Sequence, residues 1–332
     1  MERTENLIRG RRAVFVALAA VLLCAAAIMT LAPGKAYAYG FTQTAATKNS
    51  ATIAWEDPEA GNTYYTTTGY TVTWGTDYGK TTNKVSLDSA QKSYTITGLQ
   101  PGTKYYARVE YNYQSNSTKT AYSSPVGSGE VVSRVVTPTN LKQTKWWYYA
   151  KGVDFTWKVQ NAADKVEYRA YKSGSSKVAK KGSSNYPQKE YSLSKVSNNV
   201  VYTVQMRVHD KWGWSGWSKK AYLFTQPMVN DKKTKVKNNK LTITWGKIKG
   251  ATSYSIFVST KEKSGYKKVA TVKSTKSSCT LKKLGKAKIS PKKKYYVYVV
   301  ANKKVGKTTY TSGKHYTYQV KGARGNLRWT FD

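Results

Sequence analysis

The chain is poor in the residues on which most enzymes and metal sites depend. Its 332 residues include only two cysteines, Cys24 and Cys279, and two histidines, His209 and His315. The histidines lie far apart in the sequence, and no metal-ligand spacing, nucleophile elbow or phosphate-binding loop is present. The sequence therefore supports no catalysis, and we predict no enzyme activity, no cofactor and no metal site.

Acidic residues are also scarce, at 17 Asp or Glu against 56 Lys or Arg. Residues 39–137 hold 8 basic and 7 acidic side chains, residues 138–228 hold 16 and 5, and residues 229–332 hold 27 and 3. The densest acidic group, Glu56-Asp57-Pro58-Glu59, is typical of a solvated turn, with a weak cation site as the alternative. A charge gradient of this size concerns partners and solubility rather than the fold.

Long apolar stretches are absent after the first forty residues. The one such stretch, residues 13–32, follows three arginines in residues 9–12 and precedes Ala36-Tyr37-Ala38. This pattern predicts a secretory signal peptide over residues 1–38, cleaved after Ala38. An uncleaved membrane anchor is the alternative, because the stretch is long enough to span a bilayer. Cleavage would leave Cys279 as a lone thiol, and secretion without disulfides favours a bacterial protein.

What the chain does contain is one pattern repeated three times. Short alternations of apolar and polar residues, broken by Gly, Asn, Ser and Pro, predict half-buried antiparallel strands. The first phrase of the pattern is Ala51-x-Ile53-x-Trp55, Val153-x-Phe155-x-Trp157 and Leu241-x-Ile243-x-Trp245. Repetition at a domain-sized period predicts tandem copies of one fold. We expect domains at 39–137, 138–228 and 229–320, followed by a frayed tail at 321–332.

A later phrase, Tyr94-x-Ile96-x-x-Leu99-x-Pro101-x-Thr103-x-Tyr105, resembles the fibronectin type III domain. The resemblance implies an all-β chain of three tandem seven-stranded, immunoglobulin-like β-sandwiches. Each would have a core tryptophan and a corner tyrosine whose hydroxyl bonds to upstream backbone. These structural core residues are Trp55, Tyr105, Trp157, Tyr202, Trp245 and Tyr295.

The second and third copies depart from this pattern. Val196 replaces the leucine in the second copy, and in the third copy the alignment assigns Leu284 to that position. Leu284 lies five residues further from the corner tyrosine than its counterparts, which indicates an insertion of undefined conformation. The same alignment places Cys279 in an inward slot, so we expect a buried and inert thiol.

The second copy also contains Trp214-Ser215-Gly216-Trp217-Ser218, which is similar to the Trp-Ser-x-Trp-Ser motif of class I cytokine receptors. Planar guanidinium groups stack on indole faces better than ammonium groups do. Strand alternation turns Arg169 and Arg207 toward the same outer face. We therefore predict a ladder of Arg169, Arg207, Trp214 and Trp217 that stiffens the sandwich, with cytokine-type signalling as the alternative.

Two surface features remain as candidate binding sites. The first is Trp146-Trp147-Tyr148-Tyr149, which cannot face inward throughout if it is extended. Trp146 and Trp147 could stack on a glycan, or the segment could pack at the joint between the first and second domains. The second is a lysine-rich stretch whose charge calls for a nearby anion. Its candidate polyanion-binding residues are Lys282, Lys283, Lys286, Lys288, Lys292, Lys293 and Lys294.

Together these features predict a secreted, surface-associated, non-catalytic binding or adhesion protein. The basic third domain would attach to an anionic envelope polymer or glycan, and sequence-independent binding to extracellular DNA is also open. A carbohydrate-binding module using Trp146 and Trp147, or an accessory part of an extracellular enzyme system, is the alternative. We expect a monomer with no stable membrane insertion once the signal peptide is cleaved.

Overall fold

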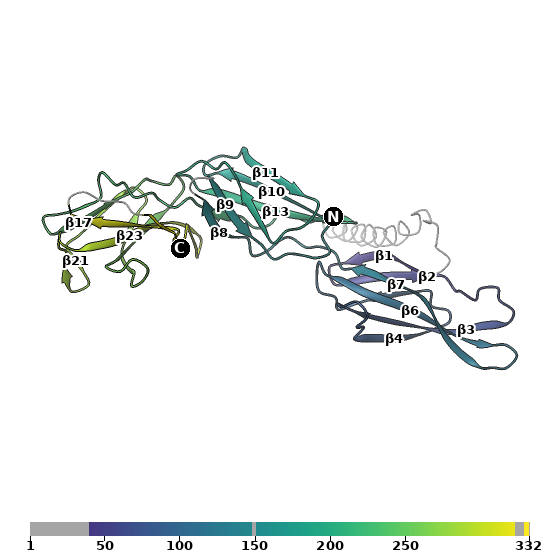
Figure 1. Cartoon of the computed structure of the whole chain (residues 1–332). Coiled ribbons are helices and arrows are strands. Elements are labelled where there is room, and N and C mark those ends of the chain that lie inside the picture. Colours follow the sequence, from purple (N-terminus) through teal and green to yellow (C-terminus); the bar gives the residue numbers. More distant parts are fainter. Residues whose placement is uncertain (1–39, 148–150, 323–328, 332) are drawn as a thin grey trace, which may run out of the picture. The chain divides into compact units, whose positions relative to one another are not determined.

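The computed structural model describes residues 40–147, 151–322 and 329–331 (Figure 1). Every regular element in these ranges is a β-strand, so the prediction of an all-β fold is confirmed. Within these ranges, no helix of sufficient length and hydrophobicity to span a membrane is found. The predicted signal peptide, residues 1–38, lies outside the described residues.

The described residues fall into two compact units. The first unit includes Ile53–Tyr94 and Tyr106–Glu130, and the second includes Thr44–Thr52, Thr95–Tyr105 and the described residues after Glu130.

Residues 41–132 form two antiparallel sheets. The three-stranded sheet has the order β1-β2-β5, with β1 at Phe41–Thr47, β2 at Ser50–Trp55 and β5 at Ser93–Ile96. The four-stranded sheet has the order β4-β3-β6-β7, with β3 at Tyr65–Gly75, β4 at Asn83–Asp88, β6 at Lys104–Ser115 and β7 at Ala121–Val132. Buried and less buried residues alternate along β2, as expected for a strand with one face on the core.

The same strand order returns in residues 142–223. A three-stranded sheet, β12-β9-β8, combines β8 at Lys142–Trp147, β9 at Gly152–Thr156 and β12 at Glu190–Leu193. A five-stranded sheet runs β11-β10-β13-β14, and β15 also pairs with β13. Its strands are β10 at Lys165–Lys172, β11 at Val178–Ser184, β13 at Tyr202–Asp210, β14 at Gly213–Trp214 and β15 at Ala221–Leu223.

It returns once more in residues 235–331, with additions. The three-stranded sheet β16-β17-β20 combines Lys235–Lys237, Lys240–Thr244 and Ser278–Leu281. The larger sheet runs β19-β18-β23-β25-β26, with β24 also paired to β23. Its strands are β18 at Ser253–Ser259, β19 at Lys267–Lys273, β23 at Lys294–Val305, β24 at Thr308–Thr311, β25 at Tyr316–Lys321 and β26 at Trp329–Phe331. A separate hairpin joins β21 (Lys283–Leu284) to β22 (Ala287–Lys288).

The end of the chain differs from the expected frayed tail. Strand β26 pairs antiparallel with β25, with Tyr318 opposite Trp329 and Tyr316 opposite Phe331. The expectation is therefore wrong for residues 329–331. Their alternation of bulky residues suits an edge strand, and β25 offers an open edge on which it can pair.

The predicted core tryptophans are all buried. Trp55 packs on Tyr70 with ring centroids 5.3 Å apart, and Trp245 packs on Tyr254 at 5.5 Å. The indole nitrogen of Trp157 donates to the carbonyl of Gln188 at 2.7 Å. Burying a side chain of this size supplies a few kcal/mol of the hydrophobic stabilisation, about 3–5 kcal/mol on truncation to alanine.

One tyrosine hydrogen bond occurs in all three stretches. The hydroxyl group of Tyr105 accepts a hydrogen bond from the backbone nitrogen of Gln100 at 2.8 Å. The equivalent bonds are Ser197 to Tyr202 and Ser290 to Tyr295, both at 2.9 Å. Each spans five residues and ties the start of a long strand to the connection before it. The bond satisfies a backbone donor that the sheets leave unpaired.

The third stretch corrects the alignment of Leu284. The buried residue six positions before the corner tyrosine is Leu99 in the first copy and Val196 in the second, and in the third it is Ile289. Leu284 instead lies on β21, half-buried, within the inserted hairpin. Cys279 is also half-buried rather than fully buried, and its partial burial raises the pKa of the thiol. In all three copies the buried residue keeps the same spacing to the corner tyrosine. The insertion therefore lies before this residue, between it and Leu281.

Candidate functional site

The seven lysines singled out in the sequence lie around one hairpin and the segment that follows it. Lys283 pairs with Lys288 across β21 and β22, and Leu284 pairs with Ala287. Lys292, Lys293 and Lys294 lead into β23. All seven side chains, Lys282, Lys283, Lys286, Lys288, Lys292, Lys293 and Lys294, are exposed. The inserted residues therefore present a dense group of ammonium charges to solvent.

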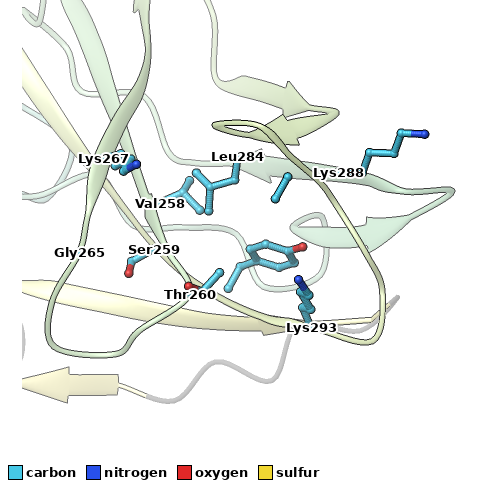
Figure 2. Close-up of a pocket in the computed structure, with 10 residues that line it drawn as sticks. Val258, Ser259, Thr260, Gly265, Lys267, Leu284, Lys288 and Lys293 are labelled. Carbon is cyan, nitrogen blue, oxygen red and sulfur yellow. The ribbon is translucent and has the colours of Figure 1, made fainter.

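A cavity of about 290 Å³ opens beside this hairpin (Figure 2). Its apolar surface comes from Val258 at the end of β18, from Leu284 and Ala287 of the hairpin, and from the ring of Tyr295. The polar residues that line it are Ser259, Thr260, Lys267, Lys288 and Lys293, with Gly265 completing the wall.

Figure 2 shows the cavity between the end of β18, the β21–β22 hairpin and the start of β23. Val258 and Leu284 lie close to one another at its apolar part, while Lys288 extends outward from the hairpin. Lys267 was not singled out from the sequence, because only the pairing of β18 with β19 brings it to this cavity. A cavity with an apolar wall and a few cationic groups can hold one unit of an anionic ligand.

Among the described residues, no acidic side chain pairs with these lysines. Asp231 and Glu262 are the acidic residues among the described residues 229–322, and both side chains are exposed. Neither forms an ion pair with a described lysine, whereas ion pairs such as Lys92–Asp57 and Arg207–Glu167 occur earlier in the chain. The lysine charges therefore repel one another, and a bound anion would relieve that repulsion.

In the acidic turn after Trp55, protein groups occupy the carboxylate of Asp57. Asp57 accepts from the Lys92 ammonium group at 2.8 Å, from the Thr67 hydroxyl at 2.5 Å and from the Glu59 backbone nitrogen at 3.1 Å. Partial burial raises the pKa of Asp57, but these hydrogen bonds outweigh it and the pKa lies below its ordinary value. Within the described residues, no group of three or more possible metal ligands is found.

The arginines and tryptophans of the second stretch form an alternating stack. The guanidinium carbon of Arg207 lies 4.4 Å from the ring centre of Trp214 and 4.8 Å from that of Trp217. The guanidinium carbon of Arg169 lies 3.9 Å from the ring centre of Trp217 and 5.7 Å from that of Tyr171. The order Trp214, Arg207, Trp217, Arg169, Tyr171 places cations and rings in turn along the outer face.

The serines of the same motif fasten it to β13. The backbone nitrogen of Met206 donates to the Ser218 hydroxyl at 3.0 Å, and that of Val208 donates to the Ser215 hydroxyl at 3.1 Å. Arg207 also pairs with Glu167, with 2.6 Å between Nη2 and Oε2. Protein groups therefore occupy both faces of the guanidinium planes of Arg169 and Arg207.

The two candidate glycan-binding tryptophans point in opposite directions. Trp146 is only 4% exposed, and its ring packs edge-on against Tyr316 at 5.2 Å. Trp147 is 47% exposed, and its indole nitrogen donates to Asp154 at 2.6 Å. Neighbouring residues of a strand face opposite sides, so the pair cannot form one platform. Tyr148 and Tyr149 lie outside the described residues.

Comparison with known proteins bears on the fold. The family model for the fibronectin type III domain matches residues 31–127. The FN1–FN3 domains of chicken CNTN1 are similar in structure at 13% identity and a TM-score of 0.33, covering 88% of this chain and 98% of that one. A two-domain fibronectin type III segment of chicken tenascin has 15% identity and a TM-score of 0.31, covering 56% and 98%. No curated protein matches the chain.

The family match agrees with the β-sheet pattern of the structure. The architecture is that of fibronectin type III-like, immunoglobulin-like β-sandwiches, as predicted from the corner phrase around Tyr105. Domains of this type are commonly non-catalytic modules for binding or adhesion.

Proposed function

We propose that the protein is secreted and works at a bacterial cell surface as a non-catalytic binding protein. Its most basic part, residues 229–322, would bind an anionic envelope polymer or glycan. The observation that carries the proposal is the uncompensated lysine cluster around the β21–β22 hairpin, with a cavity beside it. The signal-peptide pattern of residues 1–38 supports export.

The type of cation favours a flexible polymer over a rigid, planar ligand. Twenty-five lysines and no arginine occur in residues 229–322. Lysine ammonium groups act as mobile point charges, whereas arginine makes fixed bidentate contacts with phosphate or carboxylate. Diffuse attraction of this kind suits repeating phosphate or carboxylate groups on a chain without a unique conformation.

The cavity adds a place where one repeat unit could be held. Lys267 and Lys293 would face its anionic group, and the hydroxyls of Ser259 and Thr260 could bind its polar substituents. The apolar wall of Val258 and Leu284 would contact its carbon skeleton. Such a unit would be held by shape as well as by charge.

Binding of the full chain to immobilised anionic polymers tests the proposal. We expect it to bind a teichoic-acid-like polyol phosphate and heparin, with affinity that falls steeply as salt rises. DNA serves as the comparison, because any charge-driven attachment to it should be independent of sequence. Tighter binding to DNA than to either other polymer would favour a nucleic-acid partner, and failure to bind any of them at low salt would refute the proposal.

Washing the producing cells tests the location. Release of the protein by high salt alone is the expected result, because the attachment is electrostatic. Release only by detergent would instead support the uncleaved N-terminal anchor. A protein found free in the medium at low salt would contradict attachment to the surface.

A further inference from the structure

The inner face of the β4-β3-β6-β7 sheet extends beyond the strand that covers it. Strand β2 ends at Trp55, which packs on Tyr70 of β3, whereas β3 begins five residues earlier, at Tyr65. Tyr70 pairs with Tyr111 of β6, and the next inward residue of β6 is Tyr113. Figure 1 shows how far β3, β6 and β7 extend in this region.

This overhanging end of the sheet is faced with tyrosines in contact with one another. The rings of Tyr113 and Tyr122 stack at 5.3 Å with 25° between their planes, and Tyr111 stacks behind Tyr113 at 4.8 Å with 20°. Tyr65 meets Tyr113 edge-on at 5.4 Å and Tyr122 at 6.2 Å. We call Tyr65, Tyr113 and Tyr122 the tyrosine platform.

Hydrogen bonds fix the loop that leads into Tyr65. Asn62 accepts from the backbone nitrogens of Tyr64 and Tyr65 through its side-chain oxygen, at 2.8 Å and 3.2 Å. Asn116 donates from its backbone nitrogen to the Tyr64 carbonyl at 2.8 Å, and its side-chain oxygen accepts from Thr66 at 2.6 Å. A platform ordered in advance loses little conformational entropy when it binds.

The chemistry of the platform is neutral and amphipathic. All exposed large hydrophobic residues in residues 40–132 are tyrosines. The exposed apolar surface of this part therefore consists of flat rings that carry hydroxyl groups, without large aliphatic side chains. The carboxylate of Glu59, behind the platform, accepts a hydrogen bond from the Tyr111 hydroxyl at 3.1 Å and another from the Asn62 side-chain amide. No cation lies over a platform ring among the described residues. Residues 39–137 carry 8 basic and 7 acidic side chains, so this part of the chain has almost no net charge to attract a charged ligand over a distance.

We propose that the tyrosine platform binds a neutral glycan by stacking on the faces of its sugar rings. The C–H bonds on one face of a pyranose ring are polarised by the ring and hydroxyl oxygens, and the negative face of an aromatic ring attracts them. The sugar hydroxyl groups then meet the tyrosine hydroxyls and the amides of Asn62 and Asn116. A protein partner would need an apolar centre that this surface does not offer. The site is separate from the lysine cluster, and neither depends on the other.

Depletion of the full chain from solution by insoluble cellulose, chitin, mannan and starch, at high salt, tests the platform. High salt suppresses attraction through the lysines. We expect at least one of these neutral polysaccharides to bind the chain, and we expect Tyr122→Ala and Tyr65→Ala each to weaken binding about tenfold. Tyr78→Ala is the control for loss of an exposed tyrosine, because Tyr78 is 80% exposed and contacts Tyr106 instead of the platform.

Several results would overturn the proposal. One is failure of all four polysaccharides to bind the wild-type chain. Another is binding that Tyr65→Ala leaves unchanged, or that Tyr78→Ala weakens as much. If sedimentation instead shows a dimer that Tyr122→Ala dissociates, the platform is an interface between two copies. Tyr65 is 37% exposed and is the first residue of β3, so its variant should fold even if substitution at Tyr122 disturbs the stack, and circular dichroism checks both.

Discussion

The hydroxyl oxygen of Tyr295 lies 2.9 Å from the backbone nitrogen of Ser290, and this hydrogen bond closes the lysine-rich connection before β23. The ring of the same tyrosine lines the cavity beside the hairpin. One residue thus anchors the fold of the third stretch and forms part of its candidate binding surface. The inserted hairpin could be accommodated because Ile289 and Tyr295 keep the spacing that Leu99 and Tyr105 have.

Removal of this hydroxyl should destabilise the fold without altering the core. We expect Tyr295→Phe to lower the free energy of unfolding by about 1–2 kcal/mol, because the Ser290 nitrogen loses its partner. Tyr202→Phe should have a similar effect through Ser197. Tyr186→Phe is the control, since Tyr186 is 80% exposed. Denaturant unfolding followed by tryptophan fluorescence measures the changes, and equal stability of Tyr295→Phe and wild type would contradict the role given to this bond.

The cation–ring stack should distinguish arginine from lysine. We expect Arg207→Lys to lower stability by about 1–2 kcal/mol and to weaken the near-ultraviolet circular dichroism of the tryptophans, because an ammonium group does not stack between two indoles. The loss includes the pair with Glu167. Lys177→Arg, at an exposed position, is the control. An Arg207→Lys variant with wild-type stability and spectrum would show that the stack carries no stabilisation.

Exchange of the inserted hairpin should separate folding from binding. Replacing residues 282–288 by Thr-Gly, the residues between Ile96 and Leu99, should leave the partly buried Leu281 packed against the core and Ile289 buried in it. We expect the variant to fold and to bind heparin more weakly, with a smaller dependence on salt. The matched variant replaces Lys282, Lys283, Lys286 and Lys288 by glutamine.

The comparison between these two variants separates the contribution of the cavity to heparin binding from that of the lysine charges. The glutamine variant keeps the wall made by Leu284 and Ala287 and loses only charge. It should therefore retain more of the binding that persists at high salt. If both variants bind heparin as tightly as wild type, the candidate site lies elsewhere on the chain.

Tyr111 should give the region behind the platform a specific sensitivity to alkali. Burial, together with the carboxylate of Glu59, raises the pKa of Tyr111 from 10.0 to about 12. A pKa that is higher in the folded state stabilises the fold fully below 10.0, and this stabilisation is lost as pH rises through about 12. Glu59→Gln should lower the pKa of Tyr111, because the negative charge that opposes tyrosinate is gone.

The ultraviolet absorbance of tyrosinate measures this titration. The difference between the curves of wild type and Tyr111→Phe isolates Tyr111, and the same subtraction in the Glu59→Gln background should give an earlier transition. Glu56→Gln is the control for loss of a neighbouring charge. Ionisation of Tyr111 at the ordinary pKa in the wild type would contradict the contact with Glu59.

The tyrosine platform could be foreseen only in part. Tyr111 and Tyr113 are two residues apart, so alternation along a strand puts them on one face. How far a facing strand covers that face depends on the relative lengths of the two strands, which neither strand's own sequence gives. Tyr65 and Tyr122 join the platform by pairing between distant strands. The sequence left two alternatives for Trp146, stacking on a glycan or packing at the joint between the first and second domains, and its neighbour Tyr316 lies in neither of those domains.

The sequence by itself determined the all-β class, because alternation of apolar and polar residues within short segments is imposed by local strand geometry. Its resemblance to the fibronectin type III domain implied the sandwich type, the core tryptophans and the corner tyrosines. The sequence also determined the charge of residues 229–332, since charge depends only on composition. Only the tertiary structure decided that Ile289 fills the core slot, that Leu284 and Lys267 meet at one cavity, and which tyrosines remain uncovered. Those features depend on strand register and on unequal strand lengths, and contacts between distant segments set both.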